Sequence, residues 1–119
     1  MGMKSKRKGK VGEQELARKL REYGYNCGRT AQYNGKAEDG EADLRGLPGI
    51  HIECKRVEKL NLYDAVNQAK RDSEGTDDLP VVFHRRNHHE WLVAMPLDSF
   101  IEIYREYASD LLLKERTKE

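Results

Sequence analysis

The sequence predicts an α/β domain with a mixed central β-sheet flanked by helices, in the order helix, three strands, helix, two strands, helix (αβββαββα). The chain of 119 residues has the usual length of a single domain and can bury one modest core. Apolar residues recur with helical spacing near the start, the middle and the end of the chain. Short apolar or alternating runs, separated by glycine and proline, indicate strands between those helices.

The first helix is expected over residues 11–23, after a basic N-terminal arm formed by residues 1–10. Leu16 and Leu20 lie one turn apart and form its apolar stripe. Gly24 then ends the helix, and residues 25–29 are expected to form the first strand. A loop rich in Asn, Gly and acidic residues follows, before the second and third strands.

The second half of the chain contains a helix, a hairpin and a final helix. Asn61 is expected to cap a helix over residues 62–73. Residues 80–84 and 91–95 are expected to form the two strands of the hairpin. The last helix, residues 98–119, carries an apolar stripe that covers either the sheet or a partner subunit.

The segment 41–55 carries the residues suited to catalysis. Residues 47–49 (Leu-Pro-Gly) fit a three-residue hairpin loop with Gly49 in the left-handed conformation, and this register places Asp43 opposite Glu53. Side chains alternate along a strand. One face of the third strand therefore carries Ile50, Ile52 and Cys54, and the other carries His51, Glu53 and Lys55.

Two opposed carboxylates repel each other unless a cation or a proton lies between them. The oxygens of Asp43, Glu53 and the main-chain carbonyl of Cys54 suit Mg²⁺, for which Mn²⁺ can substitute. Lys55 could orient an acidified metal-bound water or neutralise a phosphate, so the predicted reaction is phosphodiester hydrolysis. The alternative is that Glu53 and Lys55 line a solvated strand face and that Asp43 caps a turn.

Charges are segregated along the chain, although the net charge is only +1. Residues 1–10 contain five lysines or arginines and no acid, whereas four acids crowd between Glu38 and Asp43. A basic segment can neutralise DNA phosphates, and an acidic pocket can concentrate metal ions. A solubilising tail is the alternative for residues 1–10.

No apolar run approaches the roughly 18 residues needed to span a bilayer, and no signal peptide is recognised. A cytoplasmic location is therefore expected. Cys27 and Cys54 both fall in expected strands, where free buried thiols are usual.

Four stretches, taken in order, resemble a known family: residues 7–16 (RKG and VGEQEL), 24–30 (GYNCGRT), 42–44 (ADL) and 52–55 (IECK). They are similar to the archaeal and phage Holliday-junction resolvases of the PD-(D/E)XK nuclease superfamily. The resemblance implies a restriction-endonuclease-like core over residues 11–97. It also implies a place in the cytoplasm of a bacterial or archaeal host cell, for a protein that a phage could encode. Ala42 replaces the proline of the motif name, which performs no chemistry, and residues 98–119 are an addition to the family pattern.

The resemblance also implies roles for individual residues. It places Glu13 with Asp43 and Glu53 in the metal site, and it makes Gln68 a weaker catalytic candidate on the helix after Lys55. Residues expected to contact DNA are Lys6, Arg7, Lys8, Lys10, Arg29, Thr30 and Arg56.

The predicted activity is Mg²⁺-dependent cleavage of four-way DNA junctions by paired, symmetric hydrolysis. One chain supplies one active site and cuts one strand, so a twofold homodimer is expected. One alternative is another structure-selective or nicking endonuclease built on the same site. A second alternative, from a different class, is a noncatalytic DNA-binding module.

Overall fold

The computed structural model describes residues 2–30 and 42–118 of the chain, and their side chains over 9–30 and 42–117. Its elements follow the predicted order of helices and strands, so the α/β fold class is confirmed. They are α1 (Gly2–Glu22), β1 (Gly28–Arg29), β2 (Leu44–Arg45), β3 (Ile50–Arg56), α3 (Leu62–Asp72), β4 (Leu79–Arg85), β5 (Leu92–Ala94) and α4 (Leu97–Lys118).

The five strands form one mixed sheet in the order β1-β2-β3-β4-β5. Neighbouring strands are antiparallel except β3 and β4, which are parallel. Parallel neighbours need a crossover connection, and α3 forms the helical part of the one between β3 and β4. The one parallel pair of this sheet therefore includes β3, the strand that carries Glu53 and Lys55.

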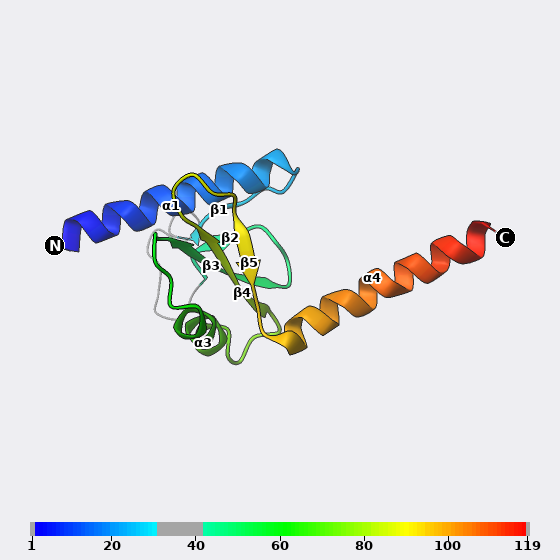
Figure 1. The fold of residues 1–119 in the computed structure, drawn as a ribbon. Coiled ribbons are helices and arrows are strands. Elements are labelled where there is room, and N and C mark those ends of the chain that lie inside the picture. Colours follow the sequence, from blue (N-terminus) through cyan, green and yellow to red (C-terminus); the bar gives the residue numbers. More distant parts are fainter. Residues whose placement is uncertain (1, 31–41, 119) are drawn as a thin grey trace.

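Two helices cover opposite faces of this sheet (Figure 1). Leu16 of α1 packs in one core cluster with Ile52 of β3. Ala65 and Ala69 of α3 pack in a second cluster with Val82 of β4. Because Glu53 pairs with Val82 across the parallel strands, its side chain belongs to the face that α3 covers.

The first helix is longer than expected, because α1 begins at Gly2 rather than at residue 11. Residues 2–10 therefore continue the helix instead of forming a separate basic arm. The apolar stripe indicated only the part of the helix that packs on the sheet. Lysine and arginine are good helix formers, so the helix can continue beyond that stripe.

The middle helix begins where it was expected. The side chain of Asn61 accepts a hydrogen bond from the Asp64 main-chain N–H at 3.1 Å and caps α3. Its inward face is formed by Ala65 and Ala69, which are buried, whereas Leu62 at the start of the helix is 47% exposed. Small side chains thus bring α3 close to the sheet.

The last helix stands apart from the sheet. Figure 1 shows α4 leaving the end of β5 and extending away from the other elements. It does not cover the sheet, which was one of its two expected roles. Among the helices of the described residues, none is long and apolar enough to cross a membrane.

Candidate active site

The β2–β3 hairpin has the predicted register, with Leu44 opposite Ile52. Gly49 has a φ of 86°, as the three-residue loop requires, and Ile50 N–H donates to the Leu47 carbonyl at 3.0 Å. Asp43 lies directly before β2, where its N–H donates to the Ile52 carbonyl at 2.9 Å. The hairpin therefore brings Asp43 beside the segment that carries Glu53.

Main-chain groups from two neighbouring segments hold Asp43 in place. The Cys54 N–H donates to Asp43 Oδ2 at 2.7 Å. The Thr30 N–H donates to the Asp43 carbonyl at 3.0 Å, and the Thr30 hydroxyl donates to the Ala42 carbonyl. These contacts fix both the backbone and the carboxylate of Asp43 before any ligand binds.

The surroundings of Asp43 oppose its negative charge. Burial, and after it the charges of Glu53 and Glu13, raise the pKa of Asp43 to about 7, against the lowering effects of the Cys54 N–H and of Lys55. A carboxylate in such surroundings becomes easier to ionise when a cation binds. Groups with strongly shifted pKa values are typical of functional sites.

Glu53 is buried together with a histidine from its own strand. His51 Nε2 lies 2.9 Å from Glu53 Oε1, and the two residues are only 4% and 2% exposed. Asp72, in the last turn of α3, completes a group whose possible ligand atoms all lie within 4.8 Å of one another. This group extends the acidic site from β3 to the helix that covers it.

His51 and Asp72 were not among the residues predicted for the site. The alternation along β3 already placed His51 on the face of Glu53, so its neighbourhood was visible in the sequence. Asp72 lies one helical turn after Gln68, which faces the same strand. A search for acidic residues at that spacing could have found it.

Lys55 and Gln68 are brought together as a pair. Lys55 Nζ donates to Gln68 Oε1 at 2.9 Å, which joins the end of β3 to α3. The amide is a neutral acceptor, so it positions the ammonium group without cancelling its positive charge. Lys55 also lies close enough to Asp43 to lower the pKa of that carboxyl group.

Glu13 reaches the site from α1, paired with Arg29 of β1. Arg29 Nε donates to Glu13 Oε1 at 2.7 Å, and the two side chains are 19% and 20% exposed. The charge of Glu13 contributes to the raised pKa of Asp43, so it lies near the acidic group. The structure therefore brings Glu13, Asp43, Glu53, Lys55 and Gln68 into one neighbourhood.

Two residues predicted to contact DNA already have partners within the protein. Thr30 is 1% exposed, and its hydroxyl supports the segment before β2. Arg56 forms ion pairs with Glu15 and Glu58, and its side chain is 17% exposed. Both side chains stabilise the framework around the site, because their polar atoms are already bound.

The remaining predicted site residues have different outcomes. Lys10 is exposed on α1, and the side chains of Lys6, Arg7 and Lys8 lie outside the described residues. The sulfur of Cys54 packs against the core, and burial strongly raises the pKa of this thiol. Cys54 thus offers no thiolate ligand, and ligation through its carbonyl stays a prediction. The acidic loop residues 32–41 lie outside the described residues.

The fold and the acidic hairpin are consistent with the core of a PD-(D/E)XK nuclease. The model of a family described as "Phage putative PDDEXK endonuclease" matches residues 4–118, so the chain belongs to that family. The superfamily predicted from the sequence is thereby confirmed, while the family description names no DNA structure as substrate. A search of curated proteins finds none that matches this chain.

Proposed function

We propose that this protein is a metal-dependent DNA endonuclease that resolves four-way junctions by paired, symmetric phosphodiester hydrolysis. The observation that carries the nuclease assignment is the acidic group at the β2–β3 hairpin, where Asp43 is held beside the strand of Glu53 and Lys55, and where burial and the charge of Glu53 raise the pKa of Asp43 to about 7. The site thus gathers negative charge where a cation would stabilise it. Membership of an endonuclease family supports the same assignment.

The donor atoms fit a hard divalent cation. Asp43, directly before β2, and Glu53 of β3 offer carboxylate oxygens, and Glu13 offers another from α1. Oxygen donors suit Mg²⁺ or Mn²⁺. His51 is bonded to Glu53, so we assign it to orienting that carboxylate rather than to direct ligation.

Each residue of the site has a part in the proposed hydrolysis. A bound divalent cation would supply an acidified water and a positive charge for the phosphate. Lys55, held by Gln68, places its ammonium group where negative charge develops on the phosphate during attack. The Cys54 N–H holds Asp43 for ligation, and His51 does the same for Glu53.

DNA binding is assigned to the basic part of α1. Five of the first ten residues are lysine or arginine, and they lie on the first turns of this helix. Basic residues bind phosphates without reading sequence, which suits an enzyme that recognises the shape of a junction. Paired cuts need two active sites, so the enzyme is proposed to act as a twofold homodimer.

The proposal is tested with a labelled synthetic four-way junction and a linear duplex of the same sequence, each in Mg²⁺, in Mn²⁺ and in chelator. Paired, symmetric cuts in the junction alone, only with Mg²⁺, are the expected result. Equal cutting of both substrates would replace the junction assignment by a general or nicking endonuclease. Binding with no cutting in either Mg²⁺ or Mn²⁺ would indicate a noncatalytic DNA-binding module.

A further inference from the structure

α4 carries a line of apolar side chains that no other described part of the chain covers. These side chains are between 41% and 72% exposed, and they are spaced alternately by three and four residues. We call them the α4 stripe: Leu97, Phe100, Tyr104, Tyr107 and Leu111. This spacing places all five along one side of the helix.

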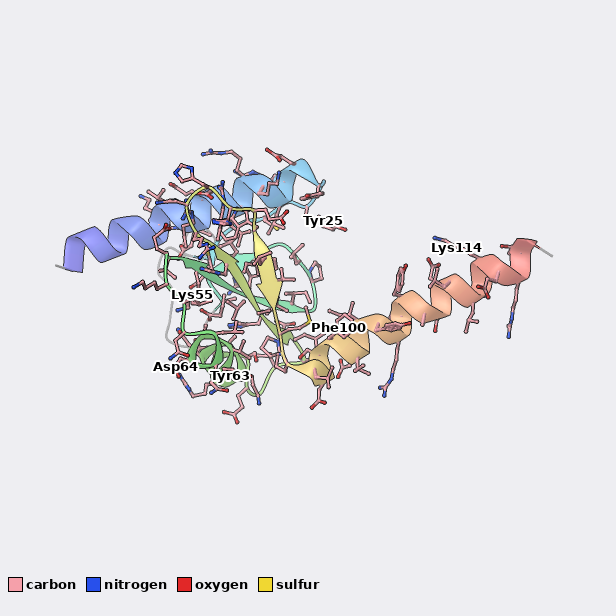
Figure 2. The ribbon with its side chains drawn as sticks, in the orientation of Figure 1. Tyr25, Lys55, Tyr63, Asp64, Phe100 and Lys114 are labelled. Atoms are coloured by element: carbon pink, nitrogen blue, oxygen red, sulfur yellow. The ribbon has the colours of Figure 1, made fainter. Side chains whose placement is uncertain are left out.

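The stripe lies on a helix that projects from the rest of the molecule. Figure 2 shows Phe100 near the start of α4 and Lys114 near its far end, well away from the sheet. Most helices in proteins gain their stability by packing an apolar face. A contiguous exposed apolar patch is typical of an interaction site.

We infer that the α4 stripe binds the α4 stripe of a second copy of this chain, in antiparallel orientation, to form a twofold homodimer. Alternate spacing by three and four residues is the pattern of a seam between two paired helices. In antiparallel pairing, Tyr104 of one copy lies beside Tyr107 of the other, and Phe100 lies beside Leu111. Because the two copies are related by a twofold axis, each contact occurs twice. Both stripes are then covered, so the assembly stops at two copies.

The charges of α4 favour the antiparallel orientation. Between residues 98 and 110 the helix has four acids and one base, whereas residues 114–118 have three bases and one acid. Parallel pairing would place the acids of one copy beside the acids of the other. In the antiparallel register given above, Arg105 of each copy instead lies level with Glu106 of the other, and Lys114 lies within one residue of the level of the partner's Asp98, so opposite charges come together.

The inference deepens the proposed function, because it assigns the interface of the proposed homodimer to α4, but the exposed stripe from which it is argued lies outside the acidic site. The 22 residues of α4 span about 33 Å. Antiparallel pairing therefore places the two sheets at opposite ends of the paired helices. Dimer formation and cleavage can be measured separately, so one proposal can fail while the other holds.

The first experiment measures the molar mass of the full chain by light scattering and sedimentation equilibrium over a concentration series. Leu111→Glu, on the stripe, is compared with Leu113→Glu, at another exposed leucine on a different side of α4. Wild type and Leu113→Glu are expected to have twice the mass of one chain. Leu111→Glu is expected to raise the dimer Kd by about 100-fold or more, because both copies lose the contact.

Circular dichroism checks that both variants keep the helix, since glutamate is a good helix former. A wild-type protein that stays monomeric at every concentration would overturn the inference. An equal rise in the dimer Kd of Leu113→Glu would overturn the assignment of the dimer interface to the α4 stripe. The catalytic variant Glu53→Gln should still dimerise, and monomeric Leu111→Glu should still nick DNA if the proposed chemistry is correct.

The second experiment tests the orientation with two single variants, Phe100→Cys and Leu111→Cys, in the presence of oxidised glutathione. Antiparallel pairing predicts a disulfide-linked dimer from the mixture of the two proteins and little from either alone. Wild type controls for the native Cys27 and Cys54. Efficient linkage within each single variant would contradict the antiparallel arrangement and indicate parallel pairing.

Discussion

His51 Nε2 lies 2.9 Å from Glu53 Oε1, with both side chains buried on the face of the sheet that α3 covers. This hydrogen bond fixes the carboxylate of Glu53 within a β-strand, where backbone motion is small. An outer partner of a metal-binding carboxylate tunes affinity by holding the ligand in one orientation. Metal binding at the proposed site is therefore expected to depend on His51, which is not itself assigned as a ligand.

His51→Ala is expected to weaken Mg²⁺ binding by about 10- to 100-fold, because Glu53 loses the group that orients it. Calorimetric titration of the metal measures this directly, without relying on DNA cleavage. His89→Ala is the matched control, since His89 is exposed on the turn between β4 and β5. Equal Mg²⁺ affinity in wild type and His51→Ala would show that His51 does not position Glu53.

The raised pKa of Asp43 predicts a pH-dependent stability in the absence of metal. Its pKa is about 7 in the folded protein against an ordinary value of 3.8, so the folded protein binds more protons than the unfolded chain between these values. Stability should therefore fall as pH rises across that window. Each unit of this pKa difference corresponds to about 1.4 kcal/mol.

Asp43→Asn removes the charge that causes this loss. In chelator, its Tm relative to wild type is expected to increase from about pH 4 to about pH 8, and Mg²⁺ should reduce the difference by stabilising the wild type alone. Asp77→Asn, at an exposed position, should show neither effect. A Tm difference that is independent of pH would contradict the charged environment described for Asp43.

Lys55 is expected to act on the phosphate rather than on the fold. Lys55→Ala should lower the cleavage rate by about 10²- to 10³-fold, which is typical for removal of one charge-stabilising donor. Gln68→Glu should also lower the rate, because a carboxylate would neutralise the ammonium group that the amide only positions. Single-turnover cleavage measures both effects. A wild-type cleavage rate in Gln68→Glu would show that the contact between Gln68 and Lys55 does not matter for the reaction.

Gly46 is expected to be essential for stability. A Cβ at this position would lie 2.6 Å from the Cys27 Cα, and its φ of 127° disfavours other residues. Gly46→Ala should therefore cost more than the roughly 1–2 kcal/mol of left-handed backbone strain alone. Gly24→Ala is the control, because Gly24 has a φ of 96° and no neighbour within 4 Å. Urea unfolding should rank Gly46→Ala as clearly less stable than Gly24→Ala.

Local sequence signals predicted the hairpin well. The loop glycine at Gly49 and the alternation along β3 together fixed the register that pairs Leu44 with Ile52. The N-cap at Asn61 similarly fixed the start of α3. These features depend on neighbouring residues, so a single sequence contains them.

Other parts of the site depend on contacts between distant segments. Asp72 reaches Glu53 only because the crossover places the last turn of α3 over β3, an orientation that local spacing does not specify. The sequence gives no sign that Arg56 pairs with Glu15, because the two residues lie 41 positions apart. Arg56 was therefore expected to be available for DNA. The sequence therefore indicated which kinds of side chain form the site, but not which distant residues those side chains contact.

The most direct test of the account is cleavage of a four-way junction by wild type, Glu53→Gln and Glu74→Gln at equal concentrations, with Mg²⁺ and with chelator. Glu74 is exposed just beyond α3, so its variant controls for the loss of one carboxylate. The account predicts Mg²⁺-dependent cleavage by wild type and Glu74→Gln, and none by Glu53→Gln, which should still bind the junction. Cleavage by Glu53→Gln at the wild-type rate would contradict the assignment of this site.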